Sequence, residues 1–88
     1  MYALDFSDKA YAIFKKLGRK NPGLVREAYK KIRQIQENPH RFKYLHANMR
    51  GLFRAHVAGS FVIVFEIDEA GKAVVIRDFD HHDKIYRT

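Results

Sequence analysis

No cysteine occurs in this sequence of 88 residues. A disulfide framework and a thiolate metal site are therefore excluded, and a reducing compartment is the natural inference. No apolar run approaches the length of a membrane span, and residues 1–5 lead straight into charged sequence without the apolar segment of a signal peptide. Internal repeats and low-complexity segments are also missing. We expect a cytoplasmic protein, not bound to a membrane, that forms one domain over residues 1–88.

Acidic residues are missing from the long stretch between Asn38 and Phe65. The whole chain has 17 Lys and Arg against 10 Asp and Glu, which gives a net charge of +7. Positive charge concentrated in one region attracts phosphates or acidic protein partners. Solubility is the alternative interpretation, and it is the favoured one for the helix lysines. The cations and histidines of this stretch are His40, Arg41, Lys43, His46, Arg50, Arg54 and His56.

Apolar periodicity predicts two amphipathic helices after a short strand over residues 2–6. Ser7 is a good N-cap for the first helix, which is expected to end at Gly18 or within residues 18–22. Asn21-Pro22 restarts the chain as a second helix, because proline is tolerated at the first helical position. Asn38-Pro39 ends that helix.

Three strands are expected after a basic loop over residues 40–50. Residues 51–57 and 61–67 flank a tight turn, and residues 73–79 follow a second turn. The order is thus β-α-α-β-β-β. The sequence predicts an α+β fold in which an antiparallel helix pair covers one face of the sheet, a C-terminal three-strand antiparallel meander follows, and the other face is open.

The strand over residues 51–57 has one apolar and one polar face. Phe53, Ala55 and Val57 alternate with Arg54 and His56, so the latter two are expected on the open face. In the partner strand, the core-facing residues are expected to be Phe61, Ile63 and Phe65, which leaves Val62, Val64 and Glu66 beside Arg54 and His56. A partly apolar floor bordered by cations suits a ligand that offers bases and phosphates, and single-stranded RNA fits best.

The same residues suit RNA cleavage through the 2′-hydroxyl. This reaction requires a base, a cation that stabilises the phosphorane, and an acid for the leaving 5′-oxygen. Histidine, with an ordinary pKa of about 6.5, is both a fair base and a fair acid. His56, Arg54 and one of His81 and His82 can fill these roles without a metal, and Tyr86 can stack on a base or assist proton transfer.

Each of these residues has an alternative interpretation. Arg54 can pair with Glu66 across neighbouring strands, and His56 can be a solvated strand residue. Tyr86 can pack its ring against the sheet. His81 and His82 can be metal ligands with Asp80 or Asp83. We expect no metal, because adjacent residues on an extended segment point apart and no cysteine completes a zinc pattern.

Four segments resemble the RelE/ParE toxins of bacterial and archaeal toxin–antitoxin pairs. They are Glu37–Pro39, the basic loop that leads into Gly51–Arg54, Phe61–Ile67, and His81–Tyr86. The last segment is similar to the family's terminal pattern of His, a basic residue, two mostly polar residues, an aliphatic residue and Tyr. Their order and spacing cover nearly the whole chain.

The resemblance implies a β-α-α-β-β-β fold and a ribosome-dependent ribonuclease that cuts mRNA in the decoding site. It also implies a RelB-like antitoxin that wraps the sheet and helices. We expect no cofactor. ParE relatives share the fold but poison DNA gyrase. A gyrase-directed toxin, or an inactive relative that retains antitoxin binding, is therefore the alternative function.

The resemblance also assigns residues. Arg54 falls where many members have a phosphate-contacting Arg, and His56 falls where the YafQ-like branch has an active-site His. His82 and Tyr86 match the C-terminal catalytic or stacking positions, while His46 is a weaker match to another active-site His of that branch. The candidate catalytic residues are Arg54, His56, His81, His82 and Tyr86, and the candidate RNA contacts are Lys43, His46, Arg50 and Lys84.

Two positions depart from the family pattern. Many RelE members have a second Arg in the return strand, where this chain has Val62, and the YafQ-like Asp near the turn is Ser60 here.

Overall fold

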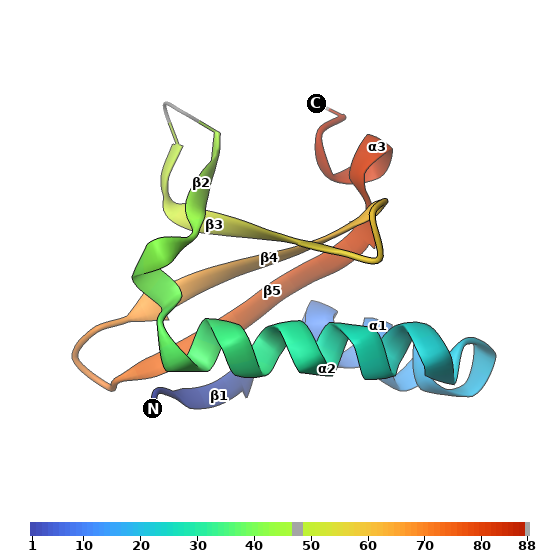
Figure 1. Cartoon of the computed structure of the whole chain (residues 1–88), viewed down its shortest axis with the longest axis horizontal. Helices are drawn as coiled ribbons and strands as arrows, with labels where there is room; N and C mark the ends of the chain where they lie inside the picture. The colour runs from blue at the N-terminus through green and yellow to red at the C-terminus, as the bar shows by residue number, and fades with distance from the viewer. Residues whose placement is uncertain (47–48, 88) are drawn as a thin grey trace.

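The chain forms a five-stranded sheet with its two long helices on one face (Figure 1). This computed structural model describes residues 1–46 and 49–87, except the side chains of residues 49 and 50. The strands lie in the order β1-β5-β4-β3-β2, with β1 parallel to β5 and the other pairs antiparallel. The elements are β1 Ala3–Phe6, α1 Asp8–Lys20, α2 Pro22–Glu37, the 3-10 turn η1 Pro39–Arg41, β2 Lys43–His46, β3 Met49–Val57, β4 Phe61–Asp68, β5 Ala73–His81 and α3 His82–Ile85.

The predicted α+β class and the placement of the helix pair are confirmed. The side-chain oxygen of Ser7 accepts a hydrogen bond from the Ala10 amide at 3.1 Å, as expected of an N-cap. Asn21 caps α2 in the same way, with Pro22 at the first helical position. No helix within the described ranges is long and apolar enough to cross a membrane.

The main core lies between the sheet and helices α1 and α2. Phe53, Ala55 and Val57 belong to it, as predicted, and so do Ile63 and Phe65 from β4. The rings of Phe53 and Phe65 stack with centroids 5.4 Å apart across the β3–β4 pair. Burial of each large side chain stabilises the fold by roughly 1.5–3 kcal/mol, so these strands are held rigidly against the helices.

The predicted basic loop contains the additional strand β2, whose Lys43 lies opposite Arg54 of β3. The rings of Tyr44 and Phe53 are 4.8 Å apart across this pair. The expectation of a loop was therefore wrong for residues 43–46 and 49–50, while residues 47–48 lie outside the described part of the chain. A cross-strand aromatic pair supplies pairing energy that the loop composition does not reveal.

Strand β5 is longer than predicted and contains an irregularity. It continues to His81, two residues beyond the predicted range of 73–79. Val64 lies opposite Asp78 and Phe65 opposite Ile76, which leaves Arg77 as an extra residue. Such a bulge shifts the alternation of side chains. Consequently, Phe79 reaches the main core on the same face as Ile76.

Candidate nucleic-acid interface

The sheet face opposite α1 and α2, here called the second face, carries a small hydrophobic cluster of its own. Val62 and Val64 are 0% and 4% exposed, and they pack with Leu45 of β2. Ile85 and Tyr86 pack against this cluster from the tail. The prediction that Val62 and Val64 form an open floor was therefore wrong, because α3 lies across the sheet from the long helices (Figure 1).

Arg54 and His56 lie on the second face, as predicted. Arg54 is directly opposite Val64, and His56 is directly opposite Val62. Directly opposed side chains of an antiparallel pair point to the same side of the sheet. Arg54 is half-buried and His56 is exposed, so the guanidinium is held more closely by its surroundings than the imidazole.

Arg54 contacts the tail. Its Nη1 donates a hydrogen bond to the Tyr86 hydroxyl oxygen at 3.3 Å. The ring of His46 from β2 meets the Tyr86 ring edge-on, with centroids 5.9 Å apart. Side chains of β2, β3 and the tail thus meet at Tyr86. Its ring packs against the sheet, as the alternative interpretation of this tyrosine expected, and its hydroxyl contacts Arg54.

The alternative partner of Arg54 is engaged elsewhere. Glu66 accepts a hydrogen bond from Nη1 of Arg77 at 3.2 Å. The alternative interpretation, in which Arg54 pairs with Glu66, is therefore not the pairing that forms, although Glu66 lies two residues from Val64 on the same face of β4.

A surface hollow of about 390 Å³ lies beside the first residue of β2, Lys43, at the point where β3 continues beyond its pairing with β2. Five of its lining residues are cations or histidine, and none is acidic. Positive charges around one concave surface raise the local concentration of anions. We call this site the basic hollow; its lining residues are Lys31, Arg41, Phe42, Lys43, Arg54, Ala55 and His56.

Two residues of the basic hollow were missed as site residues by the sequence reasoning. Lys31 was interpreted as a solvated helix lysine, and Arg41 was noted only as part of the acid-free stretch. Arg41 lies against the Phe42 ring, with its guanidinium carbon 5.2 Å from the ring centroid. The acid-free stretch signals Arg41, whereas no local signal brings Lys31 of α2 beside β3.

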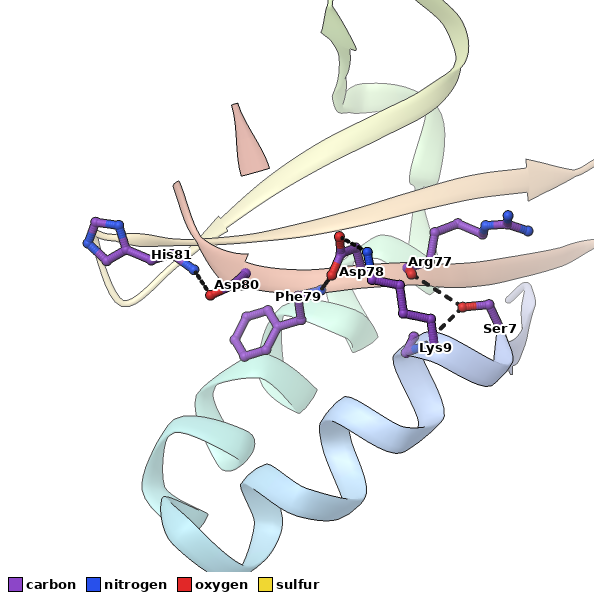
Figure 2. Close-up of polar contacts among 8 residues, drawn as sticks. Ser7, Lys9, Arg77, Asp78, Phe79, Asp80 and His81 are labelled. Atoms are coloured by element: carbon purple, nitrogen blue, oxygen red, sulfur yellow. Dashed lines mark hydrogen bonds and ion pairs between the residues drawn. The ribbon is translucent and has the colours of Figure 1, made fainter. Parts of the chain in front are cut away.

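The acidic residues of β5 on this side have partners. Asp78, opposite Val64, accepts a hydrogen bond from Lys9 Nζ at 2.9 Å, as Figure 2 shows. Asp80, opposite Val62, accepts a hydrogen bond from the His81 amide at 2.7 Å. Asp78 and Asp80 lie across β4 from Arg54 and His56, and each carboxylate thus already has a hydrogen-bond donor from another residue.

His81 and His82 lie together at the end of β5. Their rings stack at 4.6 Å, and His81 meets the ring of Phe61 edge-on at 5.7 Å. Since Phe61 packs against the main core, its strand partner His81 lies on the opposite side of the sheet from Arg54. Figure 2 shows His81 projecting past the sheet, and among the described residues no contact joins either imidazole to Arg54 or His56.

The expectation that His81 and His82 point apart was wrong. Strand β5 ends at His81 and α3 begins at His82, so the chain turns between them and brings the rings together. Among the other candidate RNA contacts, Lys43 and Lys84 are exposed, and the side chain of Arg50 lies outside the described part of the chain.

Comparison with known proteins decides the family. Residues 4–86 match the family described as the ParE toxin of the type II toxin–antitoxin system parDE. The chain belongs to the RelE/ParE toxin superfamily. A protein of Methanosarcina mazei is 44% identical over 86 residues, which cover 98% of this chain and 100% of that protein. A Methanocaldococcus jannaschii protein, provisionally named toxin RelE4, is 37% identical over 99% of this chain and 93% of its own length.

Solved structures agree with this family. The toxin–antitoxin complex RelBE2 from Mycobacterium tuberculosis contains a chain with a TM-score of 0.75 and 26% identity, over 91% of this chain and 96% of that one. The isolated E. coli RelE toxin has a TM-score of 0.75 at 20% identity, over 92% of this chain and 84% of its own, and shows likeness of fold. This RelE/ParE superfamily member is therefore a toxin of a type II toxin–antitoxin system with a RelE-like fold.

Proposed function

We propose that this toxin is a ribosome-dependent mRNA endonuclease that cleaves through the 2′-hydroxyl of RNA and needs no metal or other cofactor for the reaction. The observation that carries the proposal is the position of Arg54. Its guanidinium is fixed by Tyr86 at the border of the basic hollow, where a phosphate would find several cations and no lining carboxylate. The proposed place of action is the cytoplasm, on mRNA in the decoding site.

Arg54 is suited to the phosphate that reacts. A guanidinium donates two parallel hydrogen bonds, which match two oxygens of a phosphate or phosphorane. Preorganised donors aimed at developing negative charge are often the largest single contribution to catalysis. The hydrogen bond to Tyr86 occupies one nitrogen of Arg54, and the remaining N–H groups are available to the substrate.

His56 is suited to removal of the 2′-hydroxyl proton. It lies two residues from Arg54 on the same strand and face, and its side chain is exposed at the surface. The 2′-oxygen then bonds to phosphorus, the bond to the 5′-oxygen breaks, and a protonated group gives its proton to that oxygen. The products are a 2′,3′-cyclic phosphate and a free 5′-hydroxyl.

The donor of the second proton is proposed among the remaining imidazoles. His46 lies against Tyr86, on the side of Arg54. His81 and His82 match the family's terminal motif but lie at the end of β5, so the tail would have to move for either to reach a phosphate at Arg54. The role of His81 or His82 as the acid stays a prediction, and the geometry favours His46.

Tyr86 is suited to base recognition as well as to positioning. Its aromatic ring offers a surface on which an unstacked base can lie, and RNA recognition commonly uses such stacking. The exposed Lys43 and Lys84 and the cations of the basic hollow are proposed to contact flanking phosphates, as is Arg50. The net charge of +7 favours association with the ribosome through long-range attraction.

A RelB-like antitoxin is the proposed inhibitor. The solved relative from Mycobacterium tuberculosis is a toxin–antitoxin complex, and a protein that neutralises this toxin must cover its basic surface. An acidic or amphipathic gene that overlaps or adjoins the toxin gene is the expected source.

A second candidate is a gyrase-directed toxin or a catalytically inactive relative. Val62 stands where many RelE members have a second Arg, and it is fully buried beneath the tail. The matched family is also described by its ParE toxin.

The test is purified toxin added to programmed ribosomes, with cuts mapped on the mRNA. The proposal predicts cuts in the decoding site that disappear when a single 2′-deoxynucleotide replaces the residue before the cut. Cleavage that persists at the 2′-deoxy position would exclude the 2′-hydroxyl mechanism. Inhibition of gyrase supercoiling together with intact mRNA would favour the second candidate.

A further inference from the structure

Three potential metal ligands meet where β5 passes into α3. His81, His82 and Asp83 each offer one ligand atom, and these atoms all lie within 4.8 Å of one another. Asp83 Oδ1 is 3.0 Å from His82 Nδ1, and Asp83 Oδ2 is 3.7 Å from His81 Nδ1. We call these residues the tail triad. The two nitrogen–oxygen separations bracket the roughly 3.3 Å expected between ligands that surround one Zn²⁺ at about 2 Å. His81 Nδ1 accepts a hydrogen bond from the Asp83 amide at 3.2 Å, so His81 would bind the ion through Nε2 or after giving up this bond.

The ring geometry permits both imidazoles to reach one ion. The His81 and His82 rings are inclined by 30° with centroids 4.6 Å apart. Ring nitrogens of two neighbouring, tilted imidazoles can turn toward a common point by small side-chain rotations. The side chains of His81 and His82 are 38% and 45% exposed, so they have room to rotate and water can complete the coordination.

The backbone beneath the triad is fixed. The His82 amide donates to the Ser60 carbonyl oxygen at 2.8 Å, and the His81 amide donates to Asp80 at 2.7 Å. Phe61 packs edge-on against the His81 ring. These contacts hold the chain reversal that brings the three side chains of the triad together.

The donor set selects a class of ion. Two imidazole nitrogens and one carboxylate suit Zn²⁺ and neighbouring transition metals, whereas Mg²⁺ and Ca²⁺ prefer sets made of oxygen. We propose that His81, His82 and Asp83 bind one divalent transition-metal ion, with Zn²⁺ as the representative. The site lies at the end of β5, away from Arg54, and the ion takes no direct part in the proposed cleavage reaction.

The ion would act as a clamp on the tail. It bridges the last residue of β5 and the first two residues of α3, and α3 leads into Ile85 and Tyr86 on the second face. An ion that binds the folded tail and not the unfolded tail stabilises the folded form in proportion to its occupancy. Metal binding thereby supports the position from which Tyr86 contacts Arg54.

The experiment uses the full, untagged chain and ZnCl₂ alone. Isothermal titration is expected to give one Zn²⁺ per chain, and NMR is expected to show shifted imidazole signals of His81 and His82. His82→Ala and Asp83→Asn are expected to weaken binding at least about tenfold. His40→Ala is the matched control, because it removes an exposed imidazole that also faces a carboxylate, that of Glu69, and it is expected to leave zinc binding unchanged.

Two further measurements keep the proposal testable. Circular dichroism checks that each variant is folded, and a Mg²⁺ titration is expected to give no binding at the triad. Equal zinc affinity in wild type, His82→Ala and Asp83→Asn would overturn the proposal, as would zinc binding that leaves the His81 and His82 signals unmoved. None of these readouts depends on RNA cleavage, so failure of the metal site is distinguishable from failure of the nuclease.

Discussion

The two faces of the sheet divide stability and proposed activity between them. The face toward α1 and α2 is closed by the main core, which includes Ile63 and Phe65. The second face has a cluster with three buried residues, Leu45, Val62 and Val64, bordered by Arg54 and other polar groups. The helix-covered face therefore buries the larger set of apolar side chains, whereas the second face combines a smaller buried cluster with polar groups.

The largest expected effect concerns the helix-covered face. Phe65→Ala should lower the free energy of unfolding by about 3–5 kcal/mol, because Phe65 is fully buried. Val64→Ala on the second face should lower it by about 2 kcal/mol, since two methyl groups are lost. Urea denaturation measures both values. An equal loss in the two variants would break the comparison between the faces.

The next effect separates the histidines. His56→Ala should reduce mRNA cleavage by about 10²–10⁴-fold, as expected for loss of a general base. His82→Ala should reduce cleavage by less than about tenfold, well below the effect of losing a general base. The reason is that His82 lies with His81 at the end of β5, away from Arg54. Single-turnover cleavage on programmed ribosomes measures both. A larger loss for His82→Ala would mean that the tail moves toward Arg54 during the reaction.

A smaller effect tests how Arg54 is positioned. Tyr86→Phe keeps the ring on the hydrophobic cluster and removes the hydroxyl that accepts from Arg54. Cleavage should fall by about tenfold, which corresponds to the roughly 1.4 kcal/mol typical of one hydrogen bond. Stability should change by less than about 1 kcal/mol. Unchanged cleavage would show that the tail hydroxyl does not position the guanidinium.

The smallest effect lies at the rim, outside both faces. A hydrogen bond from His40, with the nearby charges of His40 and Lys72, lowers the pKa of Glu69 from its ordinary 4.5. Because the folded pKa is the lower one, the stabilisation is present above pH 4.5 and is lost as pH falls through the folded value. Glu69→Gln should remove this part of the acid dependence in unfolding curves from pH 6 to about 3. An unaltered curve would show that the contact does not contribute.

Local signals predicted much of the fold. Ser7 and Asn21 mark helix starts through their own side-chain hydrogen bonds, and alternation in residues 53–57 assigns Arg54 to the second face. These features depend on neighbours within a few residues, so the sequence contains them directly.

Other features depend on distant segments and were not predicted. Strand β2 forms through its pairing with β3, and the bulge at Arg77 reverses the alternation that local pattern would continue. The burial of Val62 results from the tail, and the presence of Lys31 in the basic hollow results from the packing of α2 beside β3. No window of neighbouring residues contains these contacts.

The most direct test of the central claim compares two arginines. Single-turnover mRNA cleavage on programmed ribosomes is measured for wild type, Arg54→Ala and Arg33→Ala, which removes the same charge from an exposed position of α2. For Arg54→Ala, cleavage is predicted to fall by about 10²–10³-fold, as it does when one preorganised donor to a developing negative charge is removed. For Arg33→Ala, it is predicted to fall by less than about threefold, because only long-range attraction is lost. Similar rates for the two variants, with both folded, would contradict the central claim.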